Sequence, residues 1–294
     1  MDLDIIKAMK ITILGSGTSH GIPVVGCDCP VCTSGDSRDK RMRSSVYIEG
    51  AGGEAALIDA GPEFRLQAVR AGIHRLDGIL LTHSHADHIH GLDDVRPLSR
   101  DNPIPVYGNE QTIKEMKERF SYIWGETQRG GGKPKLTPLV VDGPVQIGGL
   151  VFTPVPVKHG ILDILGWEVR DNIASENTGK CFLYLTDTSA IPPDSFRYLN
   201  RGDSTQSRLI VIGGLRMWPH ETHFSFVEAL SVALILGAGA VYLTHICHSH
   251  SHEEIEEFCQ NFKENRRASV EGTSVPNIEE IEIHPAQDGL EINL

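Results

Sequence analysis

Residue types that bind metal ions are concentrated in one short segment that follows an apolar run. After Gly-Ile-Leu-Leu-Thr the sequence reads His83-Ser-His85-Ala-Asp87-His88. On an extended chain, residues two apart point to the same side, so His83 and His85 can share one ion. The turn after them can aim Asp87 and His88 at a second ion close by. Because neutral imidazoles and a carboxylate suit Zn, Mn or Fe, the segment predicts a metal centre.

Three later residues repeat this placement singly. Each follows an apolar run and is of a metal-binding type: His159, Asp187 and His245. Enzymes with parallel strands collect their sites at the carboxyl ends of those strands, so these side chains can meet the first cluster. With it they supply seven ligands, which is enough for two divalent ions. The two oxygens of Asp187 can bridge such ions.

A second group of candidate ligands stands near the amino terminus. Cys27, Cys29 and Cys32 lie within six residues and can converge on one tetrahedral ion whose fourth ligand comes from elsewhere. A redox-active pair and free thiols are the alternatives.

The apolar runs supply the strands that must position these residues. Short β-branched runs bounded by turn residues predict strands at residues 11–14, 45–48, 55–58, 78–82, 151–157, 181–186, 209–212 and 241–244. Helical patterns cover residues 63–71, 110–120, 224–236 and 253–264. Because the first part has several strands in succession, we expect a mixed sheet or two stacked sheets. We expect one domain that spans residues 1–294.

Three further segments read as loops or turns. Residues 125–138 contain Gly-Gly-Gly-Lys-Pro and form either a lid over a site or a solvent-exposed connection. Residues 266–276 are polar and read as a surface loop. The glycine-rich residues 15–21 could cradle a phosphate with backbone amides, but no lysine or helix pattern completes a P-loop.

Composition excludes several function classes. Hydrophobic residues make up 40% and charged residues 22% of the 294 residues, as in soluble globular proteins. Lys and Arg number 27 against 39 for Asp and Glu, and the net charge of −12 argues against binding of duplex nucleic acid or a polybasic membrane contact. With no membrane span or signal peptide read in the sequence, we expect a cytoplasmic protein with reduced thiols.

The ligand series resembles that of the metallo-β-lactamase superfamily of binuclear hydrolases in order and type. The resemblance implies a four-layer αββα sandwich of two mixed β-sheets. It assigns His83, His85 and His159 to one ion and Asp87, His88 and His245 to the other, with Asp187 bridging. Asp59, in Leu57-Ile-Asp-Ala-Gly, matches an aspartate that supports the ligands in that superfamily. A turn-capping Asp is the alternative.

The amino-terminal motifs are similar to those of the PhnP-type phosphodiesterases. They comprise Gly15-Ser-Gly17-Thr-Ser-His20, Gly21-Ile-Pro23 and the three cysteines, and the similarity extends from about Lys10 to Asp288-Gly-Leu-Glu-Ile. In that family the fourth ligand of a structural zinc is a His three residues after the last active-site His, which here is His248. The zinc site would then join residues 27–32 to residue 248. Cys247 and His250 are competing ligands, and His250 and His252 read as a solvated helix start.

The same family has a non-ligand His at the mouth of the active site. The segment Thr222-His223-Phe-Ser225 matches, which implies that His223 contacts the transition state and, if protonated, neutralises or protonates the leaving oxygen. His220 is a weaker alternative, and a lone loop His is otherwise more often a cap or a surface residue. Together with Asp87 and Asp187, His223 completes the expected catalytic set.

The expected function is a metal-dependent phosphodiesterase that cleaves a small anionic phosphate ester, cyclic or acyclic, of a nucleotide or sugar. The resemblance implies two active-site ions (Zn or Mn), a hydroxide between them as the nucleophile, and one structural Zn. The alternatives are an acyl (thioester or lactam) hydrolase and a non-catalytic carrier like the pyrroloquinoline quinone biosynthesis protein B. The natural substrate, Zn versus Mn, a homodimer and the roles of His20, His220 and Arg96 stay open.

Overall fold

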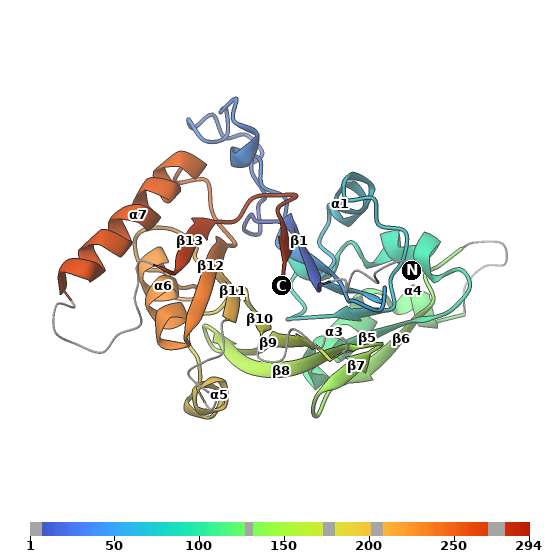
Figure 1. Ribbon diagram of the computed structural model, residues 1–294. Helices are drawn as coiled ribbons and strands as arrows, with labels where there is room; N and C mark the ends of the chain where they lie inside the picture. Colours follow the sequence, from blue (N-terminus) through green and yellow to red (C-terminus); the bar gives the residue numbers. More distant parts are fainter. Residues whose placement is uncertain (1–7, 127–131, 173–179, 201–207, 270–279) are drawn as a thin grey trace, which may run out of the picture.

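Two β-sheets lie face to face in the computed structural model, which describes residues 8–126, 132–172, 180–200, 208–269 and 280–294. Figure 1 shows the two sheets and the helices outside them. The first sheet has the strand order β14 (Glu291–Asn293), β1 (Lys10–Gly15), β2 (Ser45–Glu49), β3 (Ala55–Ile58), β4 (Gly78–Leu80), β5 (Ile104–Gly108) and β6 (Leu136–Val140).

The second sheet also has seven described strands. Its order is β13 (Glu282–Pro285), β12 (Ala238–Thr244), β11 (Arg208–Gly213), β10 (Cys181–Leu185), β9 (Leu162–Asp171), β8 (Leu150–His159) and β7 (Val145–Ile147). Both sheets are mixed. Strands β3 to β6 are parallel in the first sheet, and β10 to β13 are parallel in the second.

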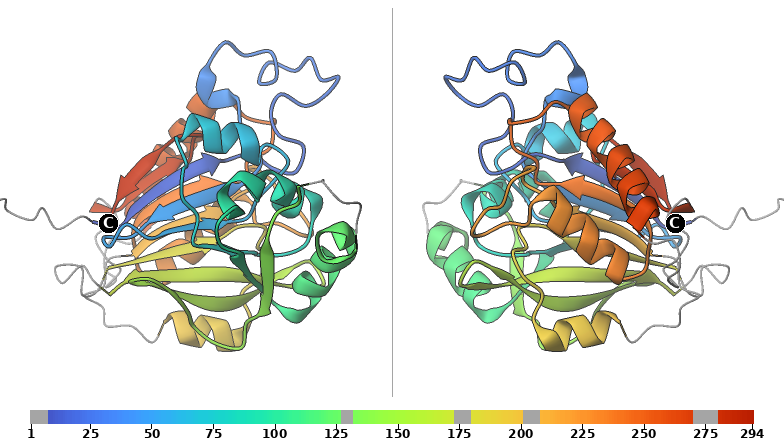
Figure 2. Two further views of the ribbon diagram at one scale, coloured as in Figure 1. Left: turned by 90° about the vertical axis from the view of Figure 1, so that its right-hand side faces the viewer. Right: turned by 90° about the vertical axis from the view of Figure 1, so that its left-hand side faces the viewer.

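Hydrophobic cores fill the space between the sheets and cover their outer faces. The central core packs Ile11, Ile48 and Ile58 of the first sheet against Trp167 and Phe182 of the second. Helices α1 (Phe64–Arg70), α3 (Glu110–Arg119) and α4 (Ser121–Trp124) cover the first sheet, together with the 3-10 helix η2 (Leu92–Ser99). Helices α5 (Pro193–Leu199), α6 (Phe226–Ile235) and α7 (His252–Ser269) cover the second. Figure 2 shows these layers from two sides, and they confirm the predicted αββα sandwich.

Every predicted strand and helix is present, but two predicted loops are wrong in part. Strand β6 begins at Leu136, inside the expected loop 125–138, because Leu136 to Val140 pair with β5. Pro138 fits there since β6 is an edge strand. Helix α7 extends to Ser269, inside the expected loop 266–276, because a polar sequence rich in Glu, Lys and Arg still favours a helix. Residues 127–131 and 270–276 of these loops lie outside the described residues.

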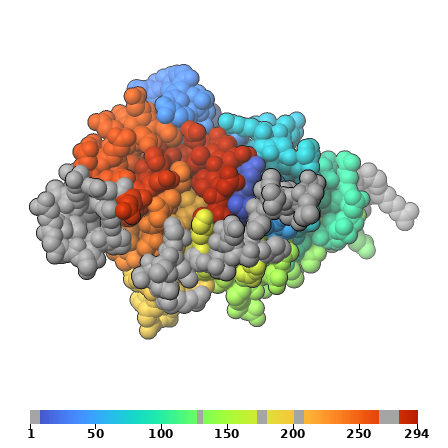
Figure 3. Space-filling model, in the orientation of Figure 1, coloured from blue at the N-terminus to red at the C-terminus, as the bar shows by residue number. Residues whose placement is uncertain are grey.

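Two segments lie at the surface around the sandwich. Residues 21–36 form a loop that projects beyond the sheets at the top of Figure 1. The carboxyl-terminal segment lies at the surface between α7 and α1 in the view of Figure 3. Among the described helices, none combines the length and apolar composition that crossing a bilayer requires.

Candidate metal centre

The segment after β4 places four of the expected ligands on one short turn. His83 follows the buried strand, and His85 precedes the one-turn helix α2 (Ala86–Ile89), which carries Asp87 and His88. The amide of His88 donates to the carbonyl of His85, so the turn is closed by its own backbone. His83, Asp87 and His88 are buried, as ligands that face an interior ion should be.

The other ligands come from the second sheet, across from this turn. His159 ends β8, Asp187 stands two residues after β10, and His245 follows β12 directly. The backbones of Asp187 and His245 have φ values of +53° and +57°, and Asp59, directly after β3, has +62°. Non-glycine residues in this region cost roughly 1–3 kcal/mol and are often found at functional sites. Three such residues at strand ends therefore indicate a functional site at this edge of the sandwich.

The predicted ligands meet as two adjoining groups. His83, His85 and His159 form one group, and Asp87, His88, Asp187 and His245 form the other, with one ligand atom per residue within 4.8 Å of the others in its group. His83 and His88, one from each group, have ring centroids only 4.2 Å apart. The structure thus brings all seven residues together, and a third group of the same kind joins Asp187 to His159 and His223.

Hydrogen bonds orient two imidazoles of the first turn. The Asp59 carboxylate accepts hydrogen bonds from His88 Nδ1 at 2.7 Å and from the Thr82 hydroxyl at 2.7 Å. Because that hydroxyl donates to Asp59, it accepts from His83 Nδ1 at 3.0 Å. Both rings therefore present Nε2 to the site. Asp59 supports the ligands, as the superfamily resemblance implied, rather than merely capping a turn.

Residues on the second sheet are oriented in the same way. The carbonyl of Thr222 can only accept, so its 2.7 Å contact with His159 Nδ1 leaves Nε2 of that ring free. The Thr186 hydroxyl donates to Asp187 Oδ1 at 2.8 Å. Such contacts fix the ring and carboxylate orientations that metal binding requires.

Two buried nitrogens and the local charge fit divalent cations. His83 Nε2 and His88 Nε2 are buried without a hydrogen-bond partner among the described residues. His88 Nε2 nevertheless lies 3.1 Å from Asp87 Oδ2 and 3.2 Å from Asp187 Oδ1. Ligands of one tetrahedral ion lie about 3.4 Å apart, given metal–ligand distances of about 2.1 Å. The donor set and spacing therefore suit metal ions.

The pKa shifts of these groups also favour a bound cation. Burial lowers the pKa of His88, but Asp87, Asp187 and Asp59 raise it well above the ordinary value. Burial lowers the pKa of His83 well below the ordinary value, so this ring is neutral and can act as a ligand. Three carboxylates around His88 call for a positive charge, which a divalent ion supplies in place of the proton.

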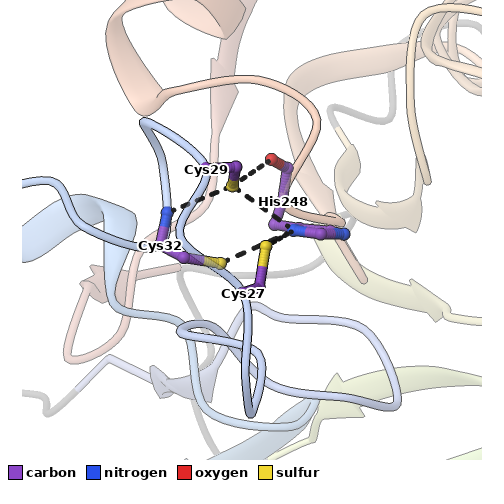
Figure 4. A group of neighbouring side chains, drawn as sticks. All are labelled: Cys27, Cys29, Cys32 and His248. Carbon is purple, nitrogen blue, oxygen red and sulfur yellow. Dashed lines mark hydrogen bonds between the residues drawn. The ribbon is translucent and has the colours of Figure 1, made fainter.

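The three cysteines and His248 form a separate group. Figure 4 shows the thiols of the projecting loop around the His248 ring. Cys27, Cys29 and Cys32 Sγ lie 3.4, 3.5 and 3.5 Å from His248 Nδ1. Sulfur and nitrogen ligands of one tetrahedral zinc lie about 3.6 Å apart, given bonds of about 2.3 and 2.1 Å. The four donors therefore fit a zinc ion better than a redox pair or free thiols.

The competing zinc ligands make other contacts. Cys247 Sγ donates to Ser249 Oγ at 3.1 Å, and the His250 ring packs edge-on against Trp218. His252 is buried rather than solvated, contrary to the expectation. The reason is that the first turn of α7 docks on η1 (Ser37–Asp39), where the His252 amide donates to Asp39 Oδ1 at 2.7 Å.

His223 lies beside the metal-ligand groups, whereas other candidates do not. Its ring is 4.6 Å from that of His159 and stacks at 4.9 Å on His245. Burial lowers the pKa of His223 to about 3, so the ring is neutral in the free protein. His220 is exposed and lies 5.2 Å from His223 between ring centroids. Arg96 donates to the Gly132 carbonyl and lines a cavity between α1 and η2.

The glycine-rich residues 15–21 support the metal-ligand residue His245 and do not form an open anion-binding loop. The amides of Gly17, Thr18 and Gly21 already donate to backbone carbonyls. A Cβ on Gly17 would lie 2.6 Å from the Arg41 carbonyl, so glycine permits close packing there. The Thr18 hydroxyl contacts His245 Nε2 at 3.0 Å. His20 is exposed at the end of this segment.

Three supporting residues were not foreseen from the sequence. Thr18 and Ser44 contact the two ring nitrogens of His245. Glu115 of α3 accepts a hydrogen bond from the hydroxyl of Ser84, the residue between two ligands in the sequence. Thr18 and Ser44 are separated from His245 by 227 and 201 positions. No local spacing signals such contacts.

Comparisons with known proteins agree with this geometry. A sequence model described as a beta-lactamase superfamily domain matches residues 55–246. An octanoyltransferase from Porphyromonas gingivalis is 35% identical over 82% of this chain and 46% of its own length. A coenzyme PQQ synthesis protein B from Methylobacterium radiotolerans is 33% identical over 37% of this chain and 40% of its own length. The chain thus spans less than half the length of these curated relatives.

Solved structures cover the whole fold. The crystal structure of a diphosphatase from the PhnP family is 36% identical, covers 97% of this chain and 98% of that chain, and has a TM-score of 0.76. Zn²⁺-bound PqqB from Methylobacterium extorquens has a TM-score of 0.71 at 19% identity, which bears on the fold alone. The ligand series, the fold and these matches place the chain in the metallo-β-lactamase superfamily and, within it, in the PhnP-type family.

Proposed function

We propose that this metal-dependent hydrolase cleaves a phosphodiester or diphosphate bond in a small anionic substrate, using two divalent ions at the metal centre. The observation that carries the proposal is the convergence of the seven expected ligands and a further imidazole, His223, on the same centre. The PhnP-family relative that is described as a diphosphatase supports phosphorus as the site of attack.

Two sets of residues would hold the two ions. His83, His85 and His159 would hold one ion, Asp87, His88 and His245 the other, and Asp187 would bridge them. When bound, the two ions supply Lewis-acid activation of the phosphoryl group and of the attacking water. Asp59 and Thr82 keep the rings of His88 and His83 in the orientation that exposes Nε2.

His223 would contact the substrate rather than an ion. Its side chain is 14% exposed, so it can reach a ligand at the mouth while its ring packs on His159 and His245. A neutral imidazole can donate one hydrogen bond to a phosphoryl or leaving-group oxygen. A donor that is fixed in advance stabilises developing negative charge at little reorganisation cost.

A second candidate function is hydrolysis of an acyl thioester. The observation that favours it is the 35% identity with a curated octanoyltransferase, of which this chain spans 46%. The same ions could polarise an acyl carbonyl. A third alternative, a non-catalytic carrier, leaves the complete ligand set without a role.

A substrate panel separates these functions. Protein loaded with Zn²⁺ or Mn²⁺ is assayed on cyclic and acyclic phosphodiesters, on dinucleoside diphosphates and on octanoyl thioesters, with Asp187→Asn as the control for contaminating activity. We expect turnover of phosphorus substrates that Asp187→Asn abolishes. Turnover of thioesters alone would establish the acyl alternative and overturn the proposal.

A further inference from the structure

The loop between β11 and α6 carries exposed groups that the proposed chemistry does not use. Its base is fixed, because Gly214 N donates to Thr244 O at 2.9 Å and Phe224 N donates to Thr188 O at 2.8 Å. Its tip, residues 216–222, lies at the surface. We call residues 214–224 the rim loop. His223, near its end, packs on His159 and His245, so the loop adjoins the metal-ligand groups.

Ring contacts lead from the metal-ligand groups to His220 on this loop. The His245 ring stacks on His223, and His223 lies 5.2 Å from His220 between ring centroids. Burial and then the positive charge of Arg216 lower the pKa of His220. Arg216 Cζ in turn lies 5.1 Å from the ring centroid of Trp218. Arg216 and Trp218 therefore lie on the same short loop as His220 and His223, whose rings lead to the ligands.

Trp218 is held in place but left half exposed. Its ring and that of His250 pack in a T-shaped arrangement at 5.4 Å between ring centroids, and Arg216 lies over the indole. Its exposed fraction is nevertheless 48%. An anchored indole with open surface suits a flat aromatic ligand, because base–aromatic stacking depends on area and little on base identity.

Arg216 is an available cation in an acidic protein. Among the described residues, no carboxylate forms an ion pair with it, and its Nε is buried without a hydrogen-bond partner. Its Nη2 donates only a long bond, of 3.3 Å, to the Pro219 carbonyl. A guanidinium stacked on an indole can also bind a phosphate oxygen with its remaining donors.

We propose that Arg216 and Trp218 form a subsite for the base of a nucleotide, so that the substrate is a nucleoside phosphodiester whose phosphorus lies at the metal centre. This inference rests on the proposed function. A sugar phosphate or an alkyl ester carries no planar base to stack on the exposed part of the indole. Trp218 is then the residue that determines specificity, and it takes no part in the chemical step.

Two chromogenic substrates with the same leaving group test the subsite. The p-nitrophenyl ester of thymidine 5′-monophosphate carries a base, and methyl p-nitrophenyl phosphate does not. For Trp218→Ala in the metal-loaded protein, we expect KM for the thymidine ester to rise about 5- to 100-fold. We expect kcat and the KM of the methyl ester to stay the same. Trp218→Phe should restore most of the loss, and Arg216→Met should raise the same KM while the exposed Arg65→Met does not.

A binding measurement adds a readout that does not depend on turnover. Thymidine 5′-monophosphate should quench the tryptophan fluorescence of the wild type, and this quenching should disappear in Trp218→Phe. Equal KM changes for both esters, or quenching that survives in Trp218→Phe, would overturn the subsite while the proposed function stands. If neither ester is hydrolysed and other phosphorus substrates also fail, the proposed function fails and this inference fails with it.

Discussion

His88 shows most clearly what single residues do in this site. Its Nδ1 donates to Asp59, while its Nε2 lies within 3.2 Å of two further carboxylates, those of Asp87 and Asp187. Without a cation, the ring must keep a proton to balance them. With an ion bound, the same nitrogen can be a ligand. The cluster therefore favours a positive charge among the carboxylates, which is the physical reason to expect strong metal binding.

The support of His88 by Asp59 makes a first prediction. Asp59→Asn should place an amide NH₂ against His88 Nδ1–H or against the Thr82 donors, and the ring should lose its orientation. We expect the affinity for active-site metal to fall about 10- to 100-fold, measured by competition with a chelating dye. The exposed carboxylate variant Asp142→Asn should leave the affinity unchanged. An unchanged affinity in Asp59→Asn would contradict the orienting role.

His223 makes a second prediction at this scale. Its ring packs on His159 and His245, and the family resemblance gives it no ligand role although it also forms a group with His159 and Asp187. His223→Ala should therefore lower kcat about 10²- to 10³-fold, as expected for loss of one transition-state donor. Metal content, measured by mass spectrometry of the digested protein, should stay at the wild-type value. A wild-type kcat would remove His223 from the mechanism, and a loss of metal would show that it acts as a ligand.

At the scale of elements, close backbone packing holds the ligand turn in place. Gly61, between β3 and α1, lies so near the turn that a Cβ there would sit 2.3 Å from the Asp87 carbonyl oxygen. Ala60 N donates to the His88 carbonyl at 2.7 Å, which ties the same segments together. The turn can therefore not shift without displacing the connection from β3 to α1.

This packing makes a third prediction. Gly61→Ala must push the turn that carries Asp87 and His88 away from its place, so we expect both a lower Tm and weaker metal binding. Overpacking of this kind costs about 1–3 kcal/mol. Gly143→Ala, where a Cβ would meet nothing within 4 Å, is the matched control for calorimetry and metal titration. Equal behaviour of the two variants would contradict the argument.

The sequence predicts the elements that carry ligands better than the elements that complete the sheets. Strands such as β10 and β12 are apolar runs that end at a ligand-type residue, and both signals are local. Strand β9 was not predicted because charged residues such as Asp163, Glu168 and Arg170 interrupt it, although Glu168 is buried. Strand β5 contains a proline, and β13 and β14 are short. Their pairing depends on tertiary contacts that no window of sequence contains.

The same distinction holds for the site. Ligands cluster or follow strands, so spacing reveals them. The hydroxyls of Thr18 and Ser44 reach His245 only because the fold brings distant segments together. Supporting residues of this kind have common side chains and no fixed spacing, and they require the structure.

For the whole molecule, the cysteine group ties the projecting loop to the segment that holds His245. His248 follows His245 closely in the same segment. The buried Arg41 strengthens the same junction, since Nη1 donates to the Cys247 carbonyl at 2.8 Å and Nη2 to the His250 carbonyl at 3.1 Å. The cysteine group and the ligand groups around His245 are therefore joined through a short, well-bonded stretch of backbone.

This junction makes a fourth prediction. Cys29→Ser should remove one zinc ion per chain and lower the Tm by about 5–10 °C, because a structural ion contributes folding free energy. Cys247→Ser lies beside the same group without belonging to it and should keep both the zinc and the Tm. If Cys29→Ser retained its zinc, the assigned ligand set would be wrong.

The acidity of the chain as a whole does not oppose an anionic substrate. The net charge is −12, yet two divalent ions at one edge of the sandwich would concentrate positive charge where the substrate must bind. Charges at a partly buried site act locally, while dispersed surface charges are screened within about 10 Å at moderate ionic strength. Binding of a small phosphate ester is therefore compatible with an acidic surface.

The most direct test of the account is phosphodiester turnover measured against the number of ions bound per chain. Metal-depleted protein is reconstituted stepwise with Zn²⁺ or Mn²⁺, and both quantities are determined on the same samples. We predict no turnover while only the cysteine site is filled, at about one ion per chain, and full turnover at about three. Full turnover at one ion, or none for any phosphodiester or diphosphate at three, would contradict a two-ion phosphorus hydrolase.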